Sequence, residues 1–182
     1  MTPEQRLARL CADEQAGEPL DILPFWGHKP NRDGSIGHGC LSQWWPQPFT
    51  VDGVSYPTAE HWMMAGKARL FDDAEGLATV LAAPTPGAAM AAGRKVRGFD
   101  EASWVAARYP LVVAGNLAKF GQNPPLADVL RHTGRRILVE ASPYDRIWGV
   151  GIAATHADIG RPGRWRGLNL LGFALMDVRD QL

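Results

Sequence analysis

An acidic and a basic side chain stand seven residues apart in the stretch from Tyr56 to Lys67. Pro57 is excluded from a helix interior, and the hydroxyl of Thr58 can accept a hydrogen bond from a first-turn amide, so a helix is predicted to begin there. Seven residues at about 100° each return to within about 20° of the starting direction, so Glu60 and Lys67 share one helix face, roughly 10 Å apart. This separation is too long for an ion pair but suits two contacts with one ligand.

The same two side chains have a simpler explanation. The helix dipole favours an acid early in a helix and a base late in it, so both can be ordinary solvated charges. Between them, however, the run from Trp62 to Ala65 is too broadly apolar for an exposed helix. If the helix is mostly buried, its charges are partly buried too and need a partner or a function. This stretch alone leaves both interpretations open.

A second stretch with chemical potential runs from Glu140 to Gly151 and directly follows a predicted buried strand. Site residues often follow strands. Asp145 supplies an acid, Trp148 an aromatic wall, and Gly149 a backbone that can approach a ligand closely. The alternative is a tight turn that Trp148 anchors in the core.

Three further positions are candidates for substrate binding. Asn169 stands at a predicted helix start whose free amides could hold a phosphate, although it can equally serve as a simple cap. Arg94 belongs to a basic cluster that suits phosphates, with a solvated charge run as the alternative. The chain has seven tryptophans, whose rings serve cores and stacking walls alike, and Trp26 is a candidate for such a wall.

The remaining patterns predict an α+β fold, mainly helical with a small sheet or hairpin. Residues 1–17 are expected to form a peripheral helix, and residues 18–182 one globular domain. A glycine-rich loop at residues 31–39 is predicted to be mobile or to wrap a site. Pro110 should kink or split the helix that Asp100 begins. The other expected elements are strands at 20–27, 49–56 as a hairpin and 137–139, and helices starting near Thr2, Asp72, Thr85, Pro124 and Asn169.

The composition of the chain argues against several classes of protein. The chain has 182 residues, 46% of them apolar, and its 19 basic and 19 acidic side chains give no net charge. No global field therefore draws it to nucleic acid or membrane, although local basic clusters remain. No apolar run suggests a signal peptide or a membrane span, so we expect a cytoplasmic protein. Neither the five histidines nor the two cysteines show metal-ligand spacing, so no metal and no cofactor are expected.

These motifs occur in one order that resembles the NADAR family, named for NAD and ADP-ribose, which includes the YbiA-like proteins. The resemblance covers roughly residues 24–182, and the loop from His28 to Gly39 is longer than in compact members. The motifs that carry it are Pro48-Phe49, Asp52-Gly53, Tyr56 to His61, Lys67, Gly93-Arg94, Phe99-Asp100, Trp104, Lys119-Phe120, Glu140 to Ser142, Asp145, Trp148 to Gly151, Trp165 to Gly172, Leu175-Met176 and Val178-Arg179.

The resemblance implies N-glycosidase chemistry on a ribosylated amine. The expected partners are a ribosyl-phosphate or ADP-ribosyl small molecule, or ADP-ribosylated nucleic acid, with no membrane partner and the oligomeric state left open. The substrate would be a phosphoribosylaminopyrimidine of riboflavin synthesis or ADP-ribosylated guanine. The matching positions give a site of Glu60, Lys67, Trp104, Asp145, Trp148 and Asn169.

A chemical role can be assigned to three of these positions. Glu60 is the expected general acid and base, with a pKa raised by the apolar surroundings of its helix. Asp145 would hold ribose hydroxyls or stabilise positive charge at C1′. Lys67 would bind phosphate or form a Schiff base at C1′. The alternative function is a non-catalytic ADP-ribose or NAD-binding module, which would need the stacking and phosphate contacts but not an acid and a base.

Overall fold

The computed structural model describes residues 1–182 and confirms an α+β fold that is mainly helical. No helix is both long and apolar enough to cross a membrane. The chain contains seven α-helices, two 3-10 helices and two separate two-stranded sheets. In chain order the elements are α1 Pro3–Gln15, β1 Ile22–Phe25, η1 His38–Leu41, β2 Phe49–Val51, β3 Val54–Tyr56, α2 Ala59–Leu70, α3 Ala74–Leu81, α4 Pro86–Gly93, α5 Glu101–Gly121, α6 Pro124–His132, β4 Ile137–Glu140, η2 Pro162–Arg164 and α7 Leu170–Arg179.

The chain forms two compact units. One combines residues 1–42 with residues 128–182, and the other is residues 43–127. We call them the terminal unit and the central unit and describe each by itself. The predicted division of the chain at residue 17 stays a prediction.

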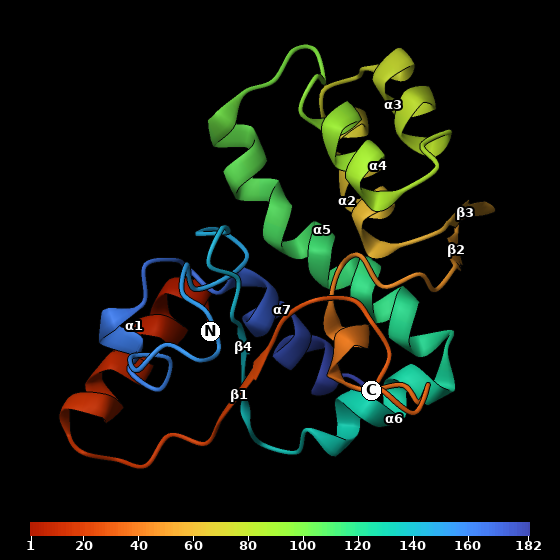
Figure 1. Ribbon diagram of the computed structural model, residues 1–182. Helices are drawn as coiled ribbons and strands as arrows, with labels where there is room; N and C mark the ends of the chain where they lie inside the picture. The colour runs from red at the N-terminus through yellow and green to blue at the C-terminus, as the bar shows by residue number, and fades with distance from the viewer. The chain divides into compact units, whose positions relative to one another are not determined.

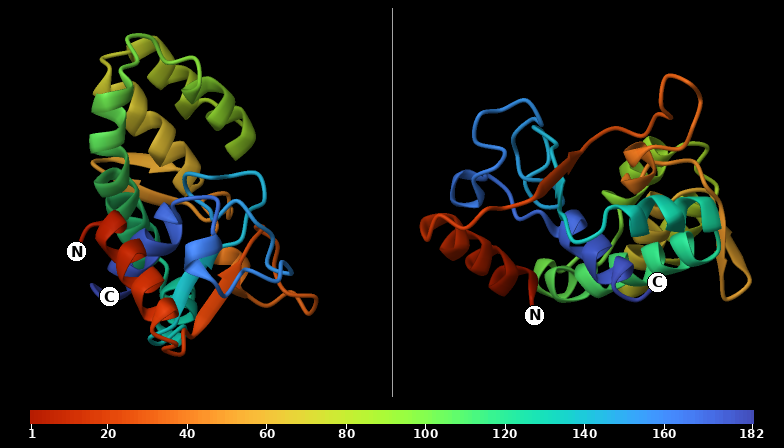
Figure 2. Two further views of the ribbon diagram at one scale, coloured as in Figure 1. Left: turned by 90° about the vertical axis from the view of Figure 1, so that its left-hand side faces the viewer. Right: turned by 90° about the horizontal axis from the view of Figure 1, so that it is seen from below.

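The terminal unit is built on a parallel strand pair. β1 and β4 lie side by side (Figures 1 and 2), with Ile22 opposite Ile137 and Phe25 opposite Glu140. Val139 of β4 is fully buried and packs in a core that the following loop completes. Because the strands are parallel, their carboxyl ends meet at one edge, so the segments that follow Phe25 and Glu140 start together.

Charged side chains attach α1 to the rest of the terminal unit. The predicted start is confirmed: Thr2 and Gln5 form a capping box at the N-terminus of α1. Arg6 forms an ion pair with Asp177 of α7. Farther along, Glu14 accepts a hydrogen bond of 2.8 Å from the amide of Gly163 in η2. α1 is therefore fixed at both ends.

In the central unit, a hairpin leads into the principal helix. Asp52 and Gly53 both have positive φ, 50° and 76°, which is the backbone that a tight two-residue hairpin turn requires. The hairpin prediction is thus confirmed, and it delivers the chain through Tyr56 to α2. Tyr56 itself is buried and packs edge-on against Trp62 of α2, with ring centroids 5.2 Å apart.

α2 lies between α3, α4 and α5 in the central unit, as Figure 1 shows. Glycines permit this packing. A Cβ on Gly115 of α5 would stand 2.1 Å from the ring of Trp62, and one on Gly93 of α4 would stand 2.1 Å from the sulfur of Met64. Any larger residue at these two positions would push the helices apart. The close contact explains why α2 is mostly buried.

Pro110 was predicted to kink or split its helix; the split is wrong, and the kink stays a prediction. α5 runs unbroken through the proline for 21 residues. A proline removes one backbone hydrogen bond, but packing against α2 on the following turn offsets that loss. The indole of Trp62 donates a hydrogen bond of 2.8 Å to the carbonyl of Leu111, and the Leu111 side chain contacts Gly66. Tertiary contacts therefore hold together a helix that local propensity would interrupt.

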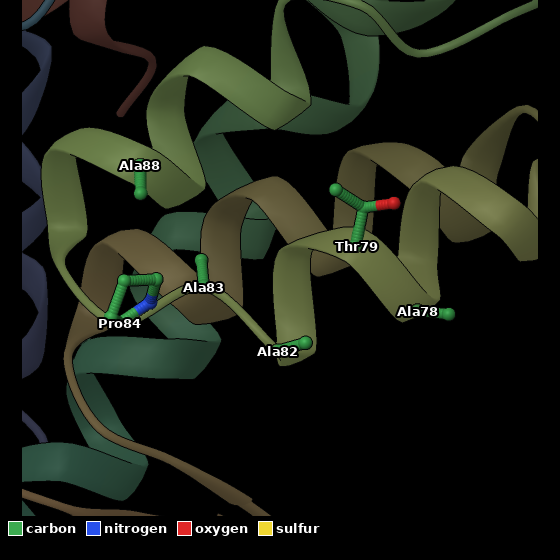
Figure 3. A pocket seen from close by; sticks show the side chains of 6 residues that line it. All are labelled: Ala78, Thr79, Ala82, Ala83, Pro84 and Ala88. Carbon is green, nitrogen blue, oxygen red and sulfur yellow. The ribbon is translucent and has the colours of Figure 1, made fainter.

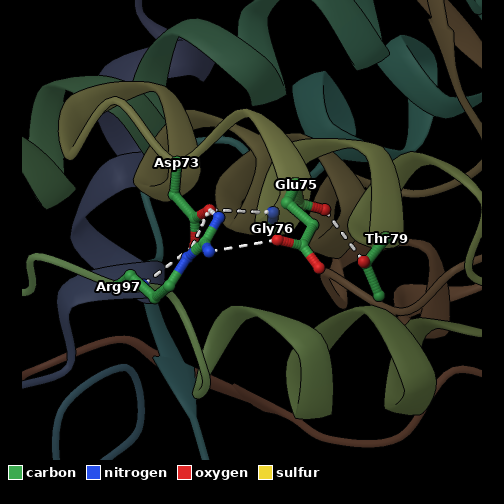
Figure 4. A network of polar contacts seen from close by, with 5 residues as sticks. All are labelled: Asp73, Glu75, Gly76, Thr79 and Arg97. Atoms are coloured by element: carbon green, nitrogen blue, oxygen red, sulfur yellow. Dashed lines mark hydrogen bonds and ion pairs between the residues drawn. The ribbon is translucent and has the colours of Figure 1, made fainter.

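A network of bonds to the carboxylate of Asp73 caps the start of α3 and fixes the segment after α4 (Figure 4). Asp73 caps the helix by accepting a hydrogen bond from the amide of Gly76, and it also accepts three from Arg97. These bonds hold the pKa of Asp73 well below its usual range. Arg97 also contacts Glu75 at 3.0 Å. One arginine of the basic cluster at residues 94–97 is therefore engaged within the protein rather than free for phosphate.

Candidate functional site

The predicted acid lies in the first turn of α2 and is almost completely buried. Thr58 is the N-cap and accepts the amide of His61, which confirms the predicted helix start. Glu60 is 4% exposed, and its amide donates to the carbonyl of Gln43 at 3.0 Å. The carboxyl group therefore has little access to water, and the backbone that carries it is fixed. This turn has the placement expected of a positioned acid.

A buried histidine fixes the same turn. The ring of His61 lies 2.8 Å from the Thr58 hydroxyl through Nδ1 and 3.1 Å from the carbonyl of Ala83 through Nε2. The Ala83 carbonyl can only accept, so Nε2 carries the proton and Nδ1 accepts from Thr58. Both ring nitrogens are therefore used within the protein. His61 acts as a structural residue that joins α2 to the segment between α3 and α4.

Lys67, at the other end of the helix face, lies between aromatic rings. Its ammonium is 4.3 Å from the centroid of Phe99 and 5.6 Å from that of Trp104. Partial burial, and secondarily the positive charge of Arg94, lower the pKa of Lys67 below the usual lysine value. The two cations are thus close enough to interact electrostatically. An anion bound there would relieve their mutual repulsion.

The central unit therefore contains the predicted residues Glu60, Lys67, Arg94 and Trp104, and it brings the last three together with Phe99. The aromatic ring of Phe99 is half exposed, so a ligand can reach it. Phe99 appears in the motifs that resemble the NADAR family, but no spacing argument identified it as a contact of Lys67. Only the turn between α4 and α5 places it against the end of α2.

Sequence reasoning missed three buried polar residues of the central unit. Asn116 and Lys119 are fully buried on α5, and Gln43 is 6% exposed. A signal was present: Asn116 and Lys119 lie on the same stripe of the helix as the buried Val112 and Phe120. Polar residues on an apolar stripe indicate a buried polar cluster, because each must be bonded or functional.

In the terminal unit, Asp145 organises the loop after β4. Its Oδ1 accepts hydrogen bonds of 2.8 Å from the amides of both Ile147 and Trp148, while its own amide donates to Ser142. One carboxylate oxygen therefore shapes the turn. The other, Oδ2, makes no contact of this kind, and the predicted role of Asp145 toward substrate stays a prediction.

The structure explains why position 149 is a glycine, which sequence reasoning did not. A Cβ at this position would lie 2.8 Å from the carbonyl oxygen of Glu140 and 3.0 Å from that of Asp145. The close backbone approach that Gly149 permits is thus made by the protein's own chain. Its predicted role in binding substrate stays a prediction.

Asn169 corrects one expectation. It occupies the N-cap position of α7 with a left-handed φ of 55°, but its side chain does not cap the helix. Instead Nδ2 donates to the carbonyl of Leu138 and Oδ1 accepts from the amide of Glu140, both in β4. The fully buried Asn169 therefore ties α7 to the sheet.

The amides at the start of α7 are also engaged. Those of Asn169, Leu170 and Leu171 donate to the carbonyls of Gly149, Ile147 and Trp148, respectively. The prediction that free amides there would hold a phosphate is wrong, because the loop after β4 folds back onto the helix start and uses them. A direct contact of Asn169 with substrate stays a prediction.

Aromatic side chains are exposed at the carboxyl edge of the β1–β4 pair. Trp26 follows β1 and is 61% exposed, and Trp148 in the loop after β4 is half-buried. Tyr144, in the same loop, is largely exposed. The terminal unit therefore contains the predicted residues Trp26, Asp145, Trp148, Gly149 and Asn169. Their joint action with Glu60 and Lys67 stays a prediction.

A shallow hollow in the surface of the central unit contains none of these residues. It lies between α3 and α4 and is lined by five small apolar side chains and Thr79 (Figure 3). Its walls offer no acid or base. No group of three or more histidine, cysteine, aspartate or glutamate side chains is arranged to hold a metal ion. The predicted absence of metal and cofactor stays a prediction.

Comparison with known proteins defines the class. The NMR structure of the Escherichia coli protein YbiA shares the fold, with a TM-score of 0.71 and 27% identity, over 90% of this chain and 86% of that one. The chain matches the NADAR domain over residues 24–182. The chain belongs to the NADAR domain family.

Relatives of known type narrow the activity. An N-glycosidase of Acanthamoeba polyphaga mimivirus is 37% identical over 159 residues, which cover 85% of this chain and 93% of that protein. The N-glycosidase YbiA of Escherichia coli K12 is 30% identical over 148 residues, 81% of this chain and 84% of that one. The prediction of an enzyme, a hydrolase of the N-glycosidase class, is confirmed.

A third relative is longer than this chain. A riboflavin biosynthesis protein of Vibrio vulnificus is 32% identical over 173 residues. The match covers 95% of this chain but only 42% of that protein.

Proposed function

We propose that this N-glycosidase hydrolyses the bond between C1′ of a phosphorylated ribosyl group and an amine. The substrate class is a phosphoribosylaminopyrimidine of riboflavin synthesis or ADP-ribosylated guanine in nucleic acid. The observation that carries the proposal is the arrangement on α2: a buried carboxyl group at its start, and at its end a lysine that lies between aromatic rings beside Arg94.

The reaction needs an acid at the leaving amine. Breaking a ribosyl C–N bond develops positive charge at C1′ and negative charge on the departing nitrogen. We assign proton transfer to Glu60, and its burial supports this role because the surrounding protein limits competing water. Asp145 is assigned to the ribose hydroxyls or to the charge at C1′. Its unbonded Oδ2 supports that assignment.

The substrate's phosphate is assigned to Lys67 and Arg94. Two cations close enough to interact electrostatically suit a doubly charged anion. Phe99 and Trp104 would flank the bound group, and Trp26 and Trp148 are assigned as further stacking surfaces. Because a diphosphate and a monophosphate would both be bound in this way, the cations support the phosphoribosyl class without choosing between the two substrates.

Lys67 also suits a covalent route. When the sugar ring opens, the neutral amine of Lys67 would attack C1′, the substrate amine would leave with a proton, and the resulting Schiff base would be hydrolysed by water. This regenerates the lysine and releases the sugar as an aldehyde. The lowered pKa of Lys67 supports the route because it increases the fraction of neutral amine.

A side-by-side turnover assay tests the proposal. Purified protein is incubated with a phosphoribosylaminopyrimidine and, separately, with single-stranded DNA that carries ADP-ribosylated guanine, and the released sugar is measured by mass spectrometry. We expect release from one of them and its loss in Glu60→Gln. The zero net charge favours the small molecule, since phosphate contacts dominate nucleic-acid affinity. The riboflavin-related relative supports the same choice. Release from neither substrate would contradict the proposal.

A further inference from the structure

Two pairs of side-chain amides connect the segment before β2 to helix α5 in the central unit. In one, Nε2 of Gln47 donates to Oδ1 of Asn123 at 2.7 Å, and Nδ2 of Asn123 donates to the carbonyls of Lys119 and Pro48. The Asn123 amide is thus satisfied on both sides. This pair is a structural link between the segment and the helix.

The other pair lies two helical turns earlier and is incompletely bonded. Nδ2 of Asn116 donates to Oε1 of Gln43 at 2.8 Å and to the carbonyl of Val112 at 2.9 Å. Nε2 of Gln43 and Oδ1 of Asn116 are buried, and neither has a hydrogen-bond partner in the protein. Leaving a buried donor and a buried acceptor unpaired is costly, and such exceptions in native structures call for an explanation.

The backbone of Gln43, one member of the incomplete pair, contacts the helix turn that carries the proposed acid. The carbonyl of Gln43 accepts the amide of Glu60 at 3.0 Å, so the backbone of Gln43 fixes the first turn of α2. From the other side, α5 packs on α2 next to Asn116, where Gly115 approaches Trp62. The unpaired donor and acceptor therefore belong to residues that adjoin α2 on two sides, one of them bonded to its first turn.

The unpaired atoms also define the group that would complete them. One is an N–H donor and the other a carbonyl acceptor, so they need a partner that both accepts and donates. A hydroxyl group does both, whereas a phosphate oxygen only accepts and an ammonium only donates. In a site closed to bulk water, such bonds are stronger than at the surface.

We infer that Gln43 and Asn116 bind a hydroxyl group of the substrate's ribosyl ring, next to Glu60. This inference rests on the proposed function, which supplies the ribosyl group. The unpaired Nε2 of Gln43 lies below the surface, so its side chain, the more exposed of the two, would have to shift to meet the ligand, with Asn116 orienting it. The pair would thus select a ribosyl over a deoxyribosyl group and place C1′ beside the acid.

Calorimetric binding tests the inference without requiring turnover. The probes are ADP-ribose and its analogues that lack the 2′- or the 3′-hydroxyl of the ribose to be transferred. The variant is Gln43→Met, which keeps the length of the side chain and removes both amide atoms. We expect Gln43→Met to weaken ADP-ribose binding about tenfold, and to change the binding of one of the deoxy analogues much less.

The matched control is Gln47→Met, which removes the satisfied amide from the same segment. It should lower the melting temperature while leaving the preference for ADP-ribose over each deoxy analogue unchanged. Equal weakening of all three ligands by Gln43→Met would show that the pair is purely structural, and would overturn the inference. The absence of ADP-ribose binding to the wild type would overturn it as well. Normal selectivity without hydrolysis of either substrate would instead contradict only the proposed function.

Discussion

The ammonium of Lys67 lies over the face of the Phe99 ring, 4.3 Å from its centroid. The negative face of an aromatic ring stabilises a cation, whereas burial and the charge of Arg94 favour the neutral amine. Burial and Arg94 lower the pKa of Lys67, and the ring face opposes that shift. Lys67 is thus held at a defined position as a base that loses its proton more readily than an exposed lysine.

Two substitutions next to Lys67 should shift its pKa in opposite directions. Arg94→Gln removes a positive charge, so it should raise the pKa of Lys67. Phe99→Leu removes the ring face that stabilises the cation, so it should lower the pKa further. NMR titration of labelled lysine side chains, with Lys67→Met to assign the signal, measures both shifts. Shifts of the same sign in the two variants would contradict this account of the site.

Borohydride trapping decides between the two roles of Lys67. In the covalent route, reduction during turnover should attach the sugar to the peptide that contains Lys67, and the yield should rise with pH as the amine loses its proton. Peptide mass spectrometry locates the adduct. Absence of the adduct in an enzyme that turns over would exclude the covalent route and leave phosphate binding as the role of Lys67.

Removing the acid should abolish catalysis while preserving the fold. Glu60→Gln keeps the size of the side chain, so the melting temperature should change little, whereas kcat should fall by about 10²-fold or more. Glu75→Gln, in an exposed side chain of α3, is the control and should leave kcat unchanged. A Glu60→Gln enzyme with normal kcat would remove Glu60 from the mechanism.

Asn169 should contribute to stability through both its side chain and its backbone. Asn169→Ala and Asn169→Gly each lose two buried hydrogen bonds, which costs about 2 kcal/mol or more of unfolding free energy. Alanine should be worse than glycine by about 1 kcal/mol, because φ is 55° and a Cβ is disfavoured there. Urea denaturation measures both values. Equal stability of the two variants would show that the backbone relaxes.

The Asp73–Arg97 pair should make stability depend on pH. The folded pKa of Asp73 lies well below the unfolded value of about 4, so the pair stabilises the protein fully above that pH. The contribution is lost as the pH falls below about 4 toward the folded pKa. Arg97→Gln should therefore destabilise the protein at pH 7, and the difference from the wild type should shrink in acid. Lys95→Gln in the same segment is the control, with no such pH-dependent difference expected.

The sequence by itself determined the local elements. Thr58 with Pro57, Asp52 with Gly53, and Thr2 with Gln5 each specify their helix start or turn through bonds and backbone angles within a few residues, so the structure confirms them. The order of the motifs also determined the family.

Only the tertiary structure decided what distant segments do to one another. Pro110 stays inside α5 because α2 packs on it, and Asn169 bonds to β4 rather than capping its own helix. The lowered pKa of Lys67 arises from burial and from Arg94, and the incomplete amide pair joins Gln43 to a helix more than seventy residues away. Burial and long-range hydrogen bonds depend on the packing of whole elements, so no local pattern in the chain encodes them alone.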